Sequence, residues 1–97
     1  MPLVQTLIKQ PSESRLFSID FSPLLASTET LAGVTSVTAL PNDGNLTLVG
    51  SASVTGAIAF QRIAAGAAGT VYKVTFVVTT SAGNTLEGEG LLKVEDL

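Results

Sequence analysis

The chain has 97 residues, which fits a single domain over residues 1–97 with a modest core. It contains no cysteine and no histidine, so disulfides, cysteine-ligated metal centres and Ser–His–Asp or Cys–His catalytic arrangements are excluded. Five Lys and Arg against eight Asp and Glu give a net charge of −3, without the basic stripe that nucleic-acid binding requires. The cations are expected to be solvated charges at strand edges and in loops: Lys9, Arg15, Arg62, Lys73 and Lys93.

Residues 1–10 are expected to form an N-terminal strand or arm, with the strand over 4–9 (VQTLIK). The apolar character of this segment is broken by Gln5 and Thr6, and the first cation is Lys9, so we expect no cleaved export signal. No apolar run approaches the ~20 residues of a membrane-spanning helix. These features predict synthesis in the cytoplasm and no membrane partner.

The segment FSIDFS, residues 17–22, alternates apolar and polar side chains. Successive side chains of a strand point to opposite faces, so Phe17, Ile19 and Phe21 are predicted to enter the core. Asp20 is then expected to face outward and to need no special partner. Pro23 lacks a backbone donor and is expected to end the strand.

The middle of the chain carries weaker strand patterns over residues 30–40, 46–50 and 57–63. In the last of these, Ile58 and Phe60 are predicted to face inward. Residues 41–45 (PNDGN) are of types typical of turns, with Gly44 directly after Asp43, and they predict a turn. The segment over 64–69 (AAGAAG) is expected to be a connection, because its two glycines disfavour a helix.

The most β-branched stretch, residues 70–80, predicts a central strand with Tyr72, Val74, Phe76 and Val78 on its inner face. The turn SAGN (81–84) leads into a second strand over 85–95, so the two form a hairpin. The face of the second strand that shares the core is expected to consist of Leu86, Gly88, Gly90, Leu92 and Val94.

Seven short strands separated by turns every ~8–12 residues predict an all-β, immunoglobulin-like antiparallel β-sandwich of about seven strands. Tyr72 fits this class, because such sandwiches place a Tyr near the start of the sixth strand with its hydroxyl bonded back to the preceding corner. The alternative is that Tyr72 is an ordinary aromatic side chain of a strand. The residues given structural roles are Tyr72, Phe17, Ile19, Phe21, Val74 and Phe76.

No catalytic, cofactor or metal site is expected, and the protein is predicted not to be an enzyme. Glu87 and Glu89 lie about 7 Å apart along one strand face and are best explained as solvated. PNDGN lacks the closing Glu of a calcium loop. The strands instead carry Thr, Ser, Ala and Val outward with few charges, which favours a subunit covered by neighbours in an assembly.

Two segments, residues 9–26 and 69–94, resemble the small phage fibre–tail adaptor proteins. Typical of that family are a Lys and Pro before an aromatic–x–Ile–Asp–Trp–Ser segment, then a Gly–Thr–x–Tyr–x–Val strand and a Thr–x–x–Gly–x–Thr turn. Phe21 replaces the Trp, Gln10 replaces an acidic residue, and the Trp expected in the third strand is missing. The matching positions are Lys9, Pro11, Phe17, Ile19, Asp20, Ser22, Gly69, Thr70, Tyr72, Val74, Thr80, Gly83, Thr85, Leu92 and Val94.

The resemblance implies a virion structural protein in the phage tail or head–tail region that joins fibres to the tail or connector ring. Its partners would be other virion proteins, in multiple copies within a symmetric assembly. The N-terminal arm is the first candidate for partner pairing, through Leu3, Val4, Leu7 and Ile8, because an apolar terminal strand can add to a neighbour's sheet edge. The alternative for the arm is the first strand of its own sandwich. The alternative function is an immunoglobulin-like binding module of a bacterial surface or secreted protein, which the absent export signal disfavours.

Overall fold

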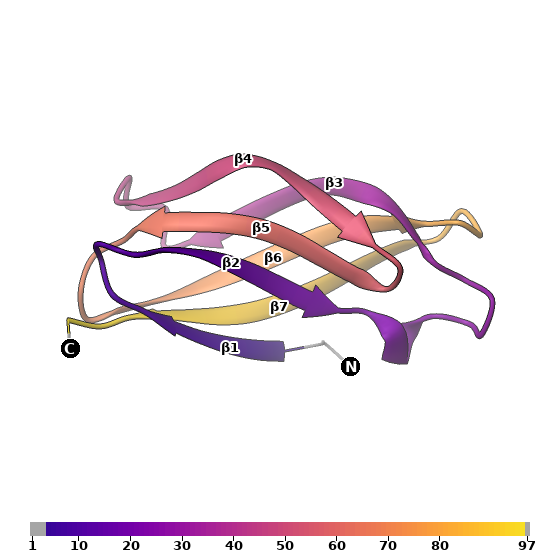
Figure 1. Ribbon diagram of the computed structural model, residues 1–97, viewed down its shortest axis with the longest axis horizontal. Coiled ribbons are helices and arrows are strands. Elements are labelled where there is room, and N and C mark those ends of the chain that lie inside the picture. Colours follow the sequence, from indigo (N-terminus) through magenta and orange to yellow (C-terminus); the bar gives the residue numbers. More distant parts are fainter. Residues whose placement is uncertain (1–3, 97) are drawn as a thin grey trace.

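The computed structural model describes residues 4–96, with side chains described from residue 6. Seven strands form two sheets, one in the order β1-β7-β6-β3 and the other in the order β2-β5-β4 (Figure 1). The all-β sandwich predicted from the alternating pattern is therefore confirmed. The elements are β1 (Val4–Lys9), β2 (Ser14–Asp20), a 3₁₀ turn η1 (Ser22–Leu24), β3 (Leu31–Leu40), β4 (Leu46–Thr55), β5 (Ile58–Ala65), β6 (Thr70–Thr80) and β7 (Thr85–Val94).

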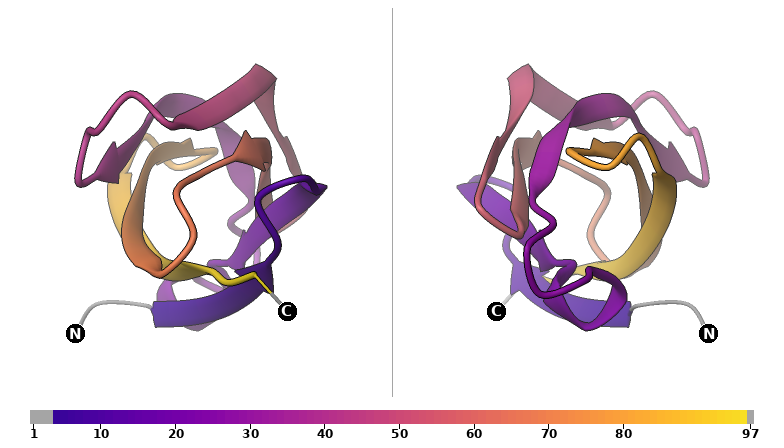
Figure 2. Two further views of the ribbon diagram at one scale, coloured as in Figure 1. Left: turned by 90° about the vertical axis from the view of Figure 1, so that its left-hand side faces the viewer. Right: turned by 90° about the vertical axis from the view of Figure 1, so that its right-hand side faces the viewer.

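The strand order is that of an immunoglobulin-like sandwich. The order 2-5-4 in one sheet and 7-6-3 in the other corresponds to the B-E-D and G-F-C strands of that architecture. The first strand differs, because β1 pairs in parallel with β7 instead of antiparallel with β2. Seen end-on, the two sheets face each other around the interior (Figure 2).

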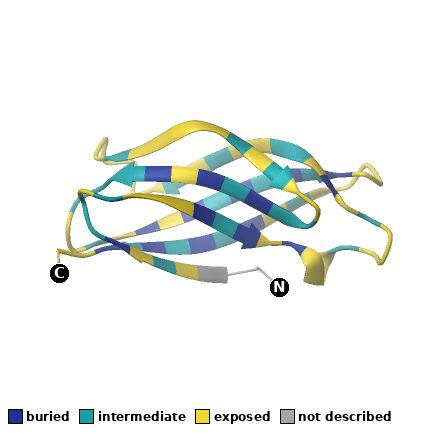
Figure 3. Cartoon of the chain, viewed as in Figure 1, coloured by how far each residue is buried: buried dark blue, intermediate teal, exposed yellow. Residues whose placement is uncertain are grey.

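The core consists of the inward faces of both sheets. Burial alternates along β6 and β7, as the period-two pattern predicted (Figure 3). Across the two sheets, the rings of Phe17 and Phe76 stack with centroids 6.1 Å apart. Gly88 of β7 makes room for Phe21, because an added Cβ would lie 2.7 Å from its ring. The buried apolar residues are Phe17, Ile19, Phe21, Leu31, Ala59, Ile63, Tyr72, Val74, Phe76, Val78, Leu92 and Val94.

The prediction for the inner face of β5 was wrong. Ala59, Gln61 and Ile63 face the core, whereas Ile58 and Phe60 lie on the outer face and are half-buried. The reason is the register: side chains of cross-strand partners share a face, and Ala59 lies opposite the buried Ile19. The sequence AIAFQRI has apolar residues in both phases, so its pattern alone cannot choose between them.

Two further expectations need correction. Asp20 is exposed, as predicted, but it has a local partner: its Oδ1 accepts a hydrogen bond from the backbone N–H of Ser22, 2.9 Å away. This bond fixes the turn that Pro23 continues.

The strand expected over 46–50 instead runs to Thr55 as β4. Gly50 adopts a positive φ of 71° at an irregularity between Val49 and Ser53, and the ladder with β5 resumes beyond it.

Candidate interaction surfaces

Strand β1 is the first strand of its own sandwich and also the edge of its sheet. Its backbone pairs with β7, from Val4 opposite Glu89 to Lys9 opposite Val94. Leu7 packs partly buried against the core, whereas the side chain of Ile8 is 47% exposed. Leu3 lies outside the described residues, as does the side chain of Val4. Of the proposed partner residues whose side chains are described, Leu7 faces inward and Ile8 faces outward, and pairing through the arm stays a prediction.

Lys9 is not the solvated charge expected from the sequence. Its side chain is buried, and its Nζ donates hydrogen bonds to the carbonyl of Gln10, 2.7 Å away, and to the carbonyl of Ala65. Burial lowers the pKa of Lys9, while the nearby Glu13 carboxylate acts in the opposite direction. Lys9 thus ties the end of β1 to the end of β5. The sequence pattern could have predicted this burial, because Lys9 is two residues after Leu7 and therefore lies on the same, inward face of the strand.

Tyr72 lies at the same end of the sandwich. Its buried hydroxyl accepts a hydrogen bond from the backbone N–H of Ala67 at 2.9 Å and donates one to Asp43 Oδ2 at 2.8 Å. The first bond is the corner arrangement of immunoglobulin-like sandwiches. The backbone N–H of Asn45 and the Tyr72 hydroxyl hold the pKa of Asp43 below its usual range, and burial raises the pKa of Tyr72. The turn over 41–45 is therefore joined to β6 by a side-chain hydrogen bond, which the sequence pattern did not predict.

The two glutamates of β7 differ in their surroundings. Glu87 is exposed, and Glu89 forms an ion pair with Lys73 at 3.2 Å. Among residues 4–96, no three acidic side chains lie close enough to hold a metal ion. Within the same range, no helix is long and apolar enough to cross a membrane.

Large apolar side chains are exposed on several strands, and charged residues are unevenly distributed along the chain. The exposed large apolar residues are Ile8, Leu16, Leu24, Leu40, Leu48, Val49 and Val71. Between Thr30 and Gln61, Asp43 is the only charged residue. Strands β3 and β4, which fill most of this stretch, carry no charge at all. Exposed apolar surfaces of this kind are suited to contact with other protein chains.

Comparison with known families identifies the chain. The model of the family described as "Podophage GP4 fiber-tail adaptor protein gp77" matches residues 9–93, which is most of the sequence. The chain therefore belongs to this family, and the resemblance noted from its two ends is confirmed. Among curated proteins, none matches the chain. The matched region begins at the buried Lys9 and leaves the preceding arm outside.

Proposed function

We propose that this podophage fibre-tail adaptor family member is a structural subunit that joins fibres to the tail or connector through protein–protein contacts. The observation that carries the proposal is the family match over residues 9–93. The apolar residues exposed on its strands and the low charge of β3 and β4 support it, since both favour contact with other chains. The subunit would be present in multiple copies in a symmetric assembly, and it would perform no chemistry.

The proposed mechanism is geometric. Two hydrogen-bonded sheets share one core, so the sandwich can hold two binding surfaces at a fixed separation. One surface would contact the tail or connector and the other a fibre. The N-terminal strand is proposed as one of these surfaces, through its open backbone edge and the exposed side chain of Ile8. Supporting this, β1 is an edge strand, and edge strands can accept a further strand from a neighbour.

The test is the composition of purified particles from the phage that encodes this chain. Quantitative mass spectrometry should find the chain at a fixed ratio to the tail or connector proteins. Particles made without it should lack fibres while retaining a filled head and tail. If such particles carried a normal set of fibres, the joining role would be wrong.

A matched pair of substitutions tests the arm separately. Ile8 and Val71 are exposed to nearly the same extent, 47% and 49%, in the same sheet. We expect Ile8→Lys to reduce incorporation into particles at least tenfold, because a charge would be buried at the contact, and Val71→Lys to leave incorporation unchanged. Normal incorporation of folded Ile8→Lys would exclude the arm as a contact while leaving the adaptor role standing.

A further inference from the structure

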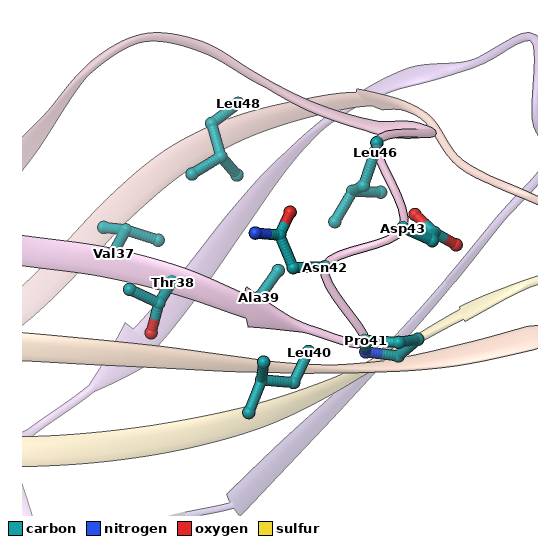
Figure 4. Close-up of a pocket in the computed structure, with 10 residues that line it drawn as sticks. Val37, Thr38, Ala39, Leu40, Pro41, Asn42, Asp43, Leu46 and Leu48 are labelled. Atoms are coloured by element: carbon teal, nitrogen blue, oxygen red, sulfur yellow. The ribbon is translucent and has the colours of Figure 1, made fainter.

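The loop between β3 and β4 contains an aspartate followed by a glycine. Asp43–Gly44 is the only place in the sequence where an Asp or Asn precedes a Gly. Both residues are exposed, and both line an open hollow of about 360 Å³, in which Figure 4 shows Asp43 beyond Pro41 and Asn42. Solvent water therefore reaches the Asp43 carboxyl and the peptide bond that follows it.

The backbone nitrogen of Gly44 is unobstructed. Glycine has no side chain, and even an added Cβ at this position would meet no atom within 4 Å apart from those of its chain neighbours. Among the described residues, the Gly44 N–H donates no hydrogen bond that would have to break first. The nitrogen can therefore approach the Asp43 side chain without displacing another group.

This arrangement suits an intramolecular rearrangement. The Gly44 nitrogen attacks Cγ of the protonated Asp43 carboxyl, so an N–Cγ bond forms while the Cγ–OH bond breaks. The nitrogen gives up its proton, one molecule of water leaves, and a five-membered succinimide ring results. Water then adds to one of the two ring carbonyls and breaks the bond from that carbon to the nitrogen. Addition at Cγ restores aspartate, whereas addition at the backbone carbonyl gives isoaspartate, in which the main chain runs through Cβ and Cγ.

Two hydrogen bonds hold the Asp43 carboxylate in its unreactive, ionised form. Its Oδ1 accepts one from the backbone N–H of Asn45 at 3.0 Å, and its Oδ2 accepts one from the Tyr72 hydroxyl at 2.8 Å. Both bonds favour the charged carboxylate and hold the pKa of Asp43 below its usual range, whereas the ring closes from the protonated form. Because Tyr72 belongs to β6, its bond also restrains rotation of the Asp43 side chain.

Asp20 provides a comparison within the same chain. It is also exposed, and its Oδ1 accepts a hydrogen bond from the backbone N–H two residues later, at 2.9 Å. The residue that follows it is the buried Phe21 instead of a glycine. The two aspartates thus share a local turn and differ in the access to the nitrogen that would attack.

We propose that Asp43–Gly44 is a self-modification site, at which aspartate converts to isoaspartate in the folded chain, and that the Tyr72 hydroxyl slows this conversion. The product has its carboxylate on Cα and an additional atom in the main chain, so the acceptor for Tyr72 is displaced. The turn over 41–45 would then be released from β6. This modification goes beyond the adaptor role and does not depend on it.

The experiment measures isoaspartate in the purified full-length chain during storage at physiological temperature and neutral pH. Chromatography and mass spectrometry of digests separate the aspartyl and isoaspartyl forms of one peptide. Isoaspartate should accumulate at Asp43 and not at Asp20. Tyr72→Phe should raise the rate at Asp43 by about three- to tenfold, the factor expected for one lost hydrogen bond.

Gly88→Ala is the matched control, because it disturbs the core against Phe21 and touches neither bond of Asp43. It should leave the rate at Asp43 within about twofold of that of the unmodified chain, and urea melts establish that both variants are folded. The proposal is overturned if no isoaspartate forms at Asp43, if Tyr72→Phe leaves its rate unchanged, or if folded Gly88→Ala accelerates it equally.

The melting temperature of the isolated isoaspartyl chain tests the release of the turn. Its Tm should lie about 4 °C or more below that of the unmodified chain. In Tyr72→Phe the same modification should lower Tm less, because the bond from the hydroxyl is already absent. An equal Tm for the modified and unmodified chains would contradict the release of the turn from β6.

Discussion

The Tyr72 hydroxyl offers a direct measure of what the corner contributes to stability. Tyr72→Phe removes one oxygen and leaves the buried ring in place, so the apolar core is unchanged. Two hydrogen bonds are lost, one from the backbone N–H of Ala67 and one to the carboxylate of Asp43. A typical intramolecular hydrogen bond contributes about 0.5–1.5 kcal/mol net. The bond to Asp43 belongs near the lower end, because that carboxylate is exposed and regains water.

We therefore expect the variant to lose about 1–2 kcal/mol of the free energy of unfolding, mainly from the partly buried Ala67 N–H left without an acceptor. For a chain of this size, that corresponds to a fall in Tm of roughly 5–15 °C. Urea unfolding followed by circular dichroism measures the change. The denaturant slope should stay constant, since the surface exposed on unfolding is nearly the same.

A double-mutant cycle with Asp43→Asn separates the two bonds. Residues in direct contact couple by at least about 0.5 kcal/mol, and that coupling should be found between positions 72 and 43. Asp43→Asn can retain the bond from Asn45, so it is milder than truncation. A loss below about 0.3 kcal/mol in Tyr72→Phe would show that the hydroxyl does not hold the corner, and additive effects in the double variant would show that its bond to Asp43 contributes no stability.

Three other perturbations test the packing and the charges. Lys9→Met leaves two backbone carbonyls without their donor and should cost about 1–3 kcal/mol, whereas Lys73→Met removes a surface ion pair and should cost under about 1 kcal/mol in the same urea assay. Gly88→Ala would place a Cβ 2.7 Å from a buried phenylalanine ring and should cost about 1–3 kcal/mol, whereas Gly33→Ala meets no atom within 4 Å; similar melts for the two would contradict the packing. The Thr80 hydroxyl, the Ala26 N–H and the Asn84 amide hold the pKa of Glu29 below its ordinary value of 4.5. The unfolded chain binds that proton more readily, so this stabilisation is present above pH 4.5 and is lost as the pH falls through the folded-state pKa. Glu29→Gln should flatten the acid limb of a stability–pH profile, and an unchanged limb would assign the acid sensitivity to other groups.

The burial of Gln61 would have been difficult to predict from local patterns. Gln61 appeared to be an outward polar residue as long as Ile58 and Phe60 were assigned to the core. Only the register of β5 against β2 showed that Gln61 faces inward, where its amide fastens the irregular part of β4.

The architecture and the family could both be predicted from the sequence. Alternation of apolar and polar residues over 17–21 and 70–94 places strands and faces, because each strand has one buried side and a period of two. The motifs at the two ends identified the family. The phase of β5, the parallel pairing of β1 and the burial of Lys9 became known only from the three-dimensional structure. These depend on contacts between residues far apart in the chain, such as Lys9 with Ala65 and Tyr72 with Asp43, and local periodicity does not encode which distant groups meet.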